Sequence, residues 1–533
     1  IPGLSWTVVS ALAEAGVRYF SSGPNYVPGL PDRGDRIGAT IKALGDKPFW
    51  WASPSGEQRL LFWMAGRGYS WFHGLNTGQM SDNSRDTVLD YVRELSSAGY
   101  PWDLIQARYT IGGDNGPTDP NLPDIVKRWN EQFETPRLVI NTAEALFAEL
   151  EKRHGTALPV MSGDMTPYWE DGAISTAAEE ALTRASARRL AQAQTLWALR
   201  TPAAFPVDQI AEAWRNVLLW HEHTWGAADS ISQPDRQDVV DQWEYKRAFA
   251  VRADQLSRAA LDGASPRTGD SIDVINTLTW PRAGLVILPA DQSRAGDRVV
   301  TAANRALPSQ RLLDGRLAVW IKDIPPLGSV RLRVEPGGPA QSDQTIKMGE
   351  SSLDNGRVRI EIDRGTGAIA RLFWRPATAG RNVVLGSPGS AGAPGVAGRG
   401  STPTAVGFTW RPGGETGKDV LIGTGLFNYL YVPGRDPSQA QGVGGVNVRV
   451  DDRGPLVATV RVESDAAGAT TLIRVVQLVA GSDTVFVSAA LDKRRVRSKE
   501  SAHLILPFSI PDGVVRLDEG EALVEPERNQ LPG

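Results

Sequence analysis

The chain has 533 residues, of which 41% are hydrophobic and 22% are charged, and its formal net charge is -4. This length exceeds what a single hydrophobic core usually holds, so we expect roughly two to four domains. The absence of cysteine excludes disulfides and thiolate metal sites, and the lack of a basic run argues against a nucleic-acid partner. No apolar run approaches the roughly 18 residues of a membrane span, so none is expected.

Short apolar runs alternate with amphipathic stretches over residues 1–172. Their periodicities predict helices at 6–15, 36–44, 87–97, 124–133 and 143–153. They also predict strands at 17–21, 48–52, 59–63, 104–109, 137–140 and 158–161. Strands that alternate with helices are typical of a parallel sheet or barrel, whose ligands bind at the carboxyl ends of the strands. We expect residues 1–172 to form a partial (β/α) barrel-like domain.

A glycine-rich polar loop follows the expected strand at 104–109. It reads Ile-Gly-Gly-Asp-Asn-Gly-Pro over residues 111–117, so Asp114 would stand at the rim where a barrel builds its site. The two glycines before it let the backbone approach a ligand closely. The alternative is an Asx-turn, in which the Asp114 carboxylate bonds its own loop.

A second polar loop, residues 162–172, follows the expected strand at 158–161. It contains two aspartates and two aromatic residues, Asp164, Tyr168, Trp169 and Asp171. Flat aromatic rings pack against the C–H groups of sugars, and indole N–H groups bond hydroxyls. Most of the 17 tryptophans lie in the first half of the chain, which hints at a sugar substrate, although most are expected to fill cores. The loop is either a sugar subsite or a simple connection.

Residues 173–265 have a continuously helical pattern, which predicts a small antiparallel helix bundle. The helix that begins near residue 207 ends in two of the five histidines. Its expected core stripe, by helical spacing, is Val207, Ile210, Trp214, Leu218 and His221. His221 is therefore expected to be a core histidine. His223 falls where the helix ends, and it is either a cap on the negative end of the helix dipole or a ligand-binding imidazole.

Residues 266–533 have a β texture. Apolar residues alternate with polar ones over 358–362 and 446–450, each before a glycine-containing turn, which predicts hairpins. We expect an antiparallel β-sandwich region that is incomplete at the C-terminus. Gly386 to Arg399, rich in small residues, predicts a long loop within it.

With these segments in view, the chain resembles glycoside hydrolase family 38, the metal-dependent retaining α-mannosidases. Asn216, Val217 and Leu219 match a family segment of the type Asn-Val-X-Leu-Leu-Gln-His-His-Asp, and His223 falls on its second, zinc-binding histidine. Glu222 replaces the first of those histidines. The family's Gly-X-Asp acid segment falls on residues 112–114, and a register one residue later would place Asn115 there.

Two further segments are similar to the family. Residues 163–168 resemble its Gly-Asp-Phe-Phe-X-Tyr stretch, with Asp171 just beyond. Residues 426–433 resemble the segment whose tyrosine reaches the sugar, which would be Tyr429. The resemblance thus implies substrate contacts by Asp164, Tyr168, Trp169, Asp171 and Tyr429.

The resemblance implies a retaining glycoside hydrolase that acts on α-mannosides, with a catalytic domain at 1–172. Asp114 would be its general acid/base, and zinc held by His223 would grip adjacent sugar hydroxyls. Gly3 and Ser5 match the segment after the family's nucleophile, so this chain is expected to be an inactive fragment that lacks the nucleophile. The alternatives are a non-catalytic carbohydrate-binding protein on the same fold, or a metal-dependent hydrolase or lyase of other specificity.

Overall fold

The computed structural model describes most of the chain. The described residues are 4–23, 36–66, 84–108, 117–166, 176–223, 226–264, 271–375, 405–408, 421, 423, 425–509, 512–518, 522–526 and 528–531. The chain divides into two compact units, each built from segments that are distant in sequence. The first comprises Ile1–Ala177, His221–Lys246 and Val514–Gly533, and the second comprises Ala178–Trp220 and Arg247–Gly513.

The sheet of the first unit is mixed rather than parallel. Its strands are, in spatial order, β1 (Tyr19–Ser22), β3 (Arg59–Met64), β2 (Pro48–Ala52) and β4 (Val160–Ser162). β1 pairs with β3 and β2 with β4 in parallel, but β2 and β3 form an antiparallel hairpin. The link at 53–58 is a turn with a positive φ at Gly56, too short for the crossover that parallel strands require. The expectation of a parallel sheet is therefore wrong at this hairpin.

Both faces of the central strands β2 and β3 are covered, which explains why these strands are apolar and buried along their length except at Arg59. The helices that the structure describes within Ile1–Ala177 are α1 (Val8–Glu14), α2 (Arg36–Leu44), α3 (Ser84–Ser97), α4 (Leu122–Gln132) and α5 (Ala143–His154). On one face Phe62 packs with Val9 of α1 and Leu44 of α2. On the other face Trp63 packs in a cluster with Phe147 of α5. Successive strand residues thus enter opposite cores.

Two of the expected strands are not strands. Residues 104–108 and 137–140 have irregular backbone. At the second of these, the Asn130 amide donates to the Leu138 carbonyl at 2.8 Å, and its oxygen accepts the Leu138 N–H at 2.9 Å. The backbone groups of Leu138 are therefore engaged by a helix side chain instead of a neighbouring strand, and Val139 and Ile140 are exposed. Apolar, β-branched composition alone gave the wrong prediction here.

The last segment of the chain belongs to the core of the first unit. It contains the short strands β23 (Leu517–Asp518) and β24 (Leu523–Val524). Val524 and Leu531 are buried in the cluster that holds Trp51 and Phe62. The Asp164 N–H donates to the Asn529 carbonyl at 2.7 Å, which joins the segment to the strand end at β4. The sequence-based division placed these residues in the β region that begins at 266.

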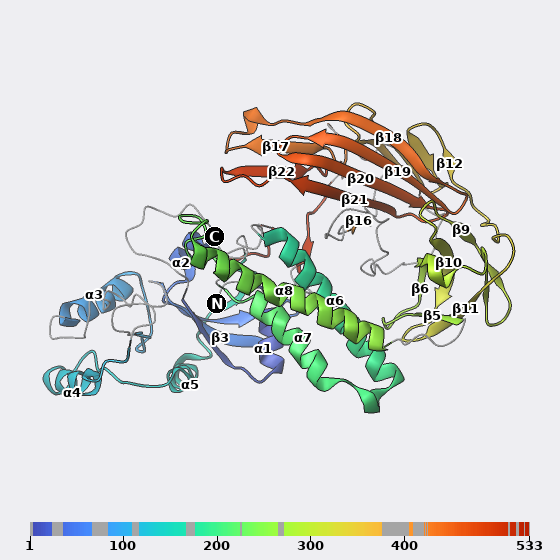
Figure 1. Cartoon of the computed structure of the whole chain (residues 1–533). Coiled ribbons are helices and arrows are strands. Elements are labelled where there is room, and N and C mark those ends of the chain that lie inside the picture. The colour runs from blue at the N-terminus through green and yellow to red at the C-terminus, as the bar shows by residue number, and fades with distance from the viewer. Residues whose placement is uncertain are drawn as a thin grey trace. The chain divides into compact units, whose positions relative to one another are not determined.

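Three helices form a bundle: α6 (Ala177–Arg200), α7 (Val207–Trp220) and α8 (Gln237–Ala264), which run alongside one another in Figure 1. The core is made largely of small and aliphatic residues: Leu190, Ala193, Ile210, Ala213, Val217, Ala253 and Ala260. Alanine on facing helices lets the helix backbones approach closely.

The buried face of α7 differs from the predicted stripe. Val207 and Leu218 are 65% and 67% exposed. The buried face instead carries Ile210, Ala213, Val217 and Trp220. Ala213 is absent from the predicted stripe because it is small. It decides which face of α7 is buried, because residues of α8 pack against it. His221 lies one residue beyond the helix end and is exposed, so its prediction as a core histidine is wrong.

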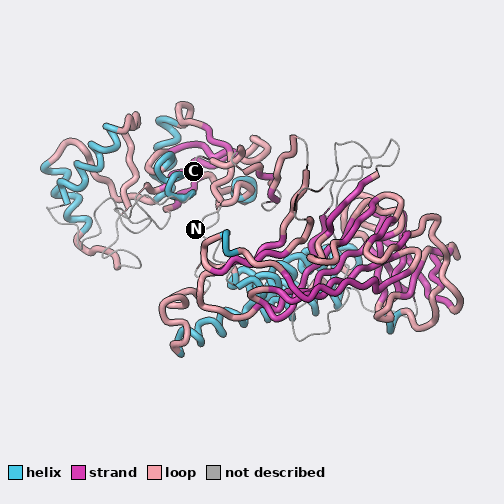
Figure 2. Tube along the Cα trace, turned by 90° about the horizontal axis from the view of Figure 1, so that it is seen from above, coloured by secondary structure: helices cyan, strands magenta, loops and turns pink. Residues whose placement is uncertain are grey.

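From Ser271 to Gly513 nearly all the described regular structure is strand (Figure 2). Two sheets come first, built from β5 (Ser271–Ile275), β6 (Arg282–Leu288), β7 (Arg298–Thr301), β8 (Ala306–Leu307), β9 (Ser309–Arg311), β10 (Leu317–Ile324) and β11 (Ser329–Glu335). A third sheet contains β12 (Lys347–Met348), β13 (Ser352–Asp354), β14 (Val358–Ile362) and β15 (Ile369–Trp374). The remaining strands are β16 (Ala405–Phe408), β17 (Tyr429–Pro433), β18 (Val443–Arg453), β19 (Val457–Ala466), β20 (Ala469–Val479), β21 (Val485–Lys493) and β22 (Glu500–Leu504).

The described strands of this region pair antiparallel, which confirms the expected β character. Both predicted hairpins are present, as β14 with β15 and β18 with β19. Ile360 of β14 and Val476 of β20 belong to one hydrophobic cluster, so these two sheets share a core. The predicted loop at Gly386 to Arg399 lies outside the described residues. Among the helices that the structure describes, none has the length and apolar character of a membrane span.

Candidate functional site

The segment after α7 carries the histidines that the sequence singles out. α7 ends at Trp220, whose side chain is fully buried and whose indole N–H donates to Glu180 Oε2 at 3.2 Å. The next residues, His221 to His223, form a turn after the helix end. The His223 side chain is 57% exposed, so its imidazole is accessible to solvent.

Glu222 links this turn to α8. Its Oε1 accepts a hydrogen bond from Lys246 Nζ at 2.7 Å, and its Oε2 lies 3.2 Å from His223 Nδ1. Lys246 is only 5% exposed, and a buried ammonium group requires a partner of opposite charge. The Glu222 carboxylate is such a partner. Gln242 of α8 donates to the Gly226 carbonyl at 2.6 Å. The turn is therefore anchored by two α8 side chains, and the carboxylate beside His223 is already engaged by a cation.

These contacts bear on whether the segment fits zinc. A structural or catalytic zinc takes three or four protein donors from His, Cys, Asp and Glu. Within the described ranges, no group of three such residues is placed to hold a metal. His223 and Glu222 supply one imidazole and one carboxylate, and Lys246 competes for the carboxylate. The described residues by themselves do not make a zinc site.

Asp164 is fully buried and is bonded by the chain itself. Its Oδ1 accepts the backbone N–H of Trp6 at 2.9 Å. Its Oδ2 accepts the backbone N–H of Thr166 at 2.9 Å and also the Thr166 hydroxyl. The carboxylate thus joins the segment at Trp6 to the segment after β4, which is a structural role. Its predicted contact with a sugar stays a prediction.

Tyr429 is also buried, at 1% exposure, on β17. Its hydroxyl donates to the Ala467 carbonyl at 2.7 Å. Burial raises the pKa of this phenol, and the nearby charge of Glu500 raises it further. The hydroxyl is therefore neutral, and it donates its proton to a carbonyl in the turn between β19 and β20. The neighbouring Tyr431 donates to Glu500 Oε2 at 2.6 Å.

The other predicted site residues lie outside the described residues. Asp114 falls within 109–116, and Tyr168, Trp169 and Asp171 fall within 167–175. Their roles stay predictions from the sequence.

Sequence reasoning missed a polar cluster at the carboxyl ends of β1 and β3. It consists of Ser21, Gln106 and Arg108, joined by side-chain hydrogen bonds. The sequence does hold an indication of this cluster. Ser21 and Arg108 both fall at the ends of expected strands, where ligands bind in such sheets.

The sequence matches no family model and no curated protein. The fold, by contrast, is similar to the crystal structure of an alpha-mannosidase from Enterococcus faecalis V583, with a TM-score of 0.56 at 11% sequence identity. The likeness covers 94% of this chain and 60% of that protein, so this chain spans less than two thirds of its length. At such low identity the likeness concerns the fold alone. The protein has a mannosidase-like fold.

Proposed function

We propose that the protein is a retaining glycoside hydrolase that acts on α-mannosides. The observation that carries the proposal is the mannosidase-like fold, which extends over 94% of the chain. The residues that resemble the histidine segment of glycoside hydrolase family 38 lie at the end of α7, and His223 is accessible to solvent there. An oligosaccharide or glycoside is accordingly the proposed substrate.

In this proposal Asp114 is the general acid/base. Retaining glycosidases use two carboxyl groups about 5 to 5.5 Å apart, one of which attacks the anomeric carbon while the other protonates the leaving oxygen. Asp114→Asn removes the acidic proton at nearly constant size. We expect this variant to lower kcat about 10²- to 10⁴-fold on a substrate with a poor leaving group.

The test is an aryl-glycoside panel with the full-length product of the gene, in which α-mannoside is compared with β-mannoside and α-glucoside. We expect selective release from the α-mannoside. The exposed Asp124 on α4 provides a control, because Asp124→Asn makes the same chemical change at a residue to which the proposal assigns no role. Sugar binding without release from any glycoside would contradict the proposal and favour a non-catalytic carbohydrate-binding protein.

Zinc bound through His223 is a second part of the proposal, and it rests on the sequence resemblance. Metal analysis of purified protein tests it independently of turnover. We expect His223→Ala to lose bound zinc. We expect His503→Ala, which removes another exposed histidine on β22, to keep it. Equal zinc content in the two variants would remove His223 from the metal site.

A further inference from the structure

The polar cluster at the ends of β1 and β3 is held by strand register. Ser21 of β1 pairs with Trp63 of β3 in a parallel ladder, so the two carboxyl ends lie together. The Ser21 hydroxyl donates to Gln106 Oε1 at 3.0 Å, with the Trp63 carbonyl at 3.3 Å as the alternative acceptor. Both strands are built into the two cores of the first unit, so the position of Ser21 is fixed by packing.

Arg108 brings a positive charge to this cluster but has only neutral partners there. Its Nε donates to Gln106 Oε1 at 3.3 Å, and its Nη2 donates to the Ser21 hydroxyl. Burial lowers the pKa of the guanidinium, which Asp46 and Tyr91 partly offset through space. In the part of the chain that the structure describes, no carboxylate lies within ion-pair distance of Arg108. Its Nε and Nη2 are engaged by these partners, and among the described residues its remaining N–H groups have no acceptor.

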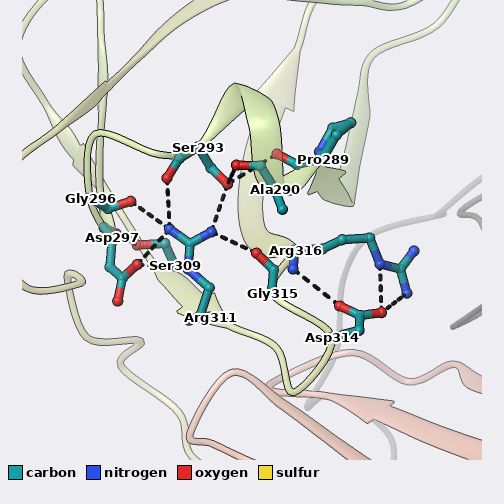
Figure 3. A network of polar contacts seen from close by, with 10 residues as sticks. All are labelled: Pro289, Ala290, Ser293, Gly296, Asp297, Ser309, Arg311, Asp314, Gly315 and Arg316. Carbon is teal, nitrogen blue, oxygen red and sulfur yellow. Dashed lines mark hydrogen bonds and ion pairs between the residues drawn. The ribbon is translucent and has the colours of Figure 1, made fainter.

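Arg311 shows, by contrast, a structural arginine whose N–H groups all contact acceptors of the protein (Figure 3). Its Nε and Nη2 donate to Asp297 Oδ1 at 2.9 and 2.7 Å. The remaining donors reach the Ser293 hydroxyl and carbonyl and the carbonyls of Gly296 and Gly315. Arg311 thus has a carboxylate and four other acceptors, whereas Arg108 has two neutral ones.

Trp63 is a second donor without an acceptor among the residues that the structure describes. Its side chain is fully buried, and its indole N–H has no hydrogen-bond partner there. A buried donor left unpaired destabilises the folded state, and such groups are rare in folded proteins. Trp63 lies beside Ser21 in the ladder, on the strand whose end carries the cluster. Among the described residues, the indole of Trp63 and the guanidinium of Arg108 thus both keep N–H groups that no hydrogen bond engages.

We propose that Ser21, Gln106 and Arg108 form a subsite that binds an anionic oxygen group, a carboxylate or a phosphate. A guanidinium presents parallel N–H donors that match the two oxygens of such a group. Gln106 and Ser21 orient the guanidinium, because they hold Nε and Nη2 and leave Nη1 for the ligand. The subsite does not depend on glycoside cleavage.

Binding of simple anions to the full chain tests this subsite. Inorganic phosphate, acetate and a hexose 6-phosphate are titrated by calorimetry in a buffer without other multivalent anions. We expect measurable binding, and we expect Arg108→Gln to weaken it at least ~10-fold. The matched control is Arg59→Gln, which removes the same charge from an exposed position on β3, over the Trp50 ring. This control is expected to change the affinity less than ~2-fold.

If Arg108→Gln does not fold, Arg108→Lys is the second variant, because it keeps the positive charge. We expect this variant to bind more weakly than the unaltered chain, because an ammonium lacks the planar pair of donors. A hexose phosphate that binds more tightly than phosphate would show that the anion is a substituent of a sugar, and equal affinities would indicate free phosphate. The proposal is overturned if no anion binds, since Asp46 would then be sufficient as a distant counter-ion. Equal affinities in the Arg108→Gln and Arg59→Gln variants would overturn it as well.

Discussion

At the scale of single residues, Asp164 has an unusual position for a carboxylate. It is fully buried, and its oxygens accept hydrogen bonds from the N–H groups of Trp6 and Thr166 and from the Thr166 hydroxyl. A carboxylate can be buried in this way because hydrogen bonds to its charged form replace those of water. The bond to Trp6 spans 158 residues of sequence.

Asp164→Ala should therefore destabilise the first unit. The substitution leaves two buried N–H groups without acceptors, so we expect a loss of about 2–4 kcal/mol in the free energy of unfolding. Urea unfolding followed by tryptophan fluorescence measures it. Asp90→Ala, which removes an exposed carboxylate paired with Arg93, should cost well under about 1 kcal/mol. A fully stable Asp164→Ala variant that had lost only sugar binding would instead support the contact predicted from the sequence.

The same residue shows what a sequence reveals about a site. The position of Asp164 directly after a strand could be predicted, because the apolar run before it is clear. The direction in which its side chain points could not be predicted, because the group that donates to its Oδ1 is the backbone N–H of Trp6, far away in sequence. Arg108 presents the same difficulty, because its partner Ser21 lies on β1, 87 residues away in the sequence. Side-chain chemistry is visible in a sequence, whereas the acceptor or donor opposite it is set by tertiary packing.

At the scale of elements, a charged cluster joins α6 to α8 within the bundle. Asp254 of α8 accepts from Arg189 of α6 at 2.5 Å and from Arg258 at 2.9 Å. Arg189 also donates to the Ser257 hydroxyl of α8 at 2.5 Å. Burial by itself raises the pKa of Asp254, but the bonds from Arg258 and Arg189 outweigh it, so the pKa is lowered.

Asp254→Asn should weaken the bundle in a pH-dependent way. Because the folded-state pKa is depressed, the stabilisation is complete above the unfolded value of about 3.9 and is lost as pH falls through the folded value. We expect the variant to be about 1–2 kcal/mol less stable at pH 7, allowing for partial exposure, and the difference to vanish in acid. Helical circular dichroism during urea unfolding at several pH values measures this. Asp262→Asn, exposed on the same helix, should show no such pH dependence.

The elements themselves were largely predictable where periodicity is long or turns are marked by glycine. The helix expected at 36–44 has those bounds, and the β14–β15 hairpin forms around Gly365 and Gly367 as predicted. The face of α7 was not predictable from large apolar residues, because close packing at Ala213 decides it. Expected strands failed where an amide side chain, that of Asn130, bonds the backbone first. Local pattern defines an element, and its neighbours define its orientation and pairing.

At the scale of the whole molecule, the chain returns at its end to the unit in which it began. Leu531 is 4% exposed and packs in the cluster that contains Trp51 and Phe62. Its backbone N–H donates to the Asp164 carbonyl at 2.8 Å. No sequence pattern indicates this return, because the last segment has only two short strands and resembles a loop. Composition therefore assigns it to the adjoining β region, whereas burial assigns it to the first unit.

This arrangement predicts a mutational effect far away in sequence. Leu531→Ala should cost about 2–5 kcal/mol, because it opens a cavity in the core of the first unit. Hydrogen exchange should then accelerate in β2 and β3, whose Trp51 and Phe62 line that cluster, and stay unchanged in β19 and β20. Leu523→Ala is the matched control, since Leu523 lies in the same terminal segment but is 62% exposed. Faster exchange in β19 and β20 with β2 and β3 unaffected would mean that the terminal segment belongs energetically to the β region, as its position in the sequence suggests.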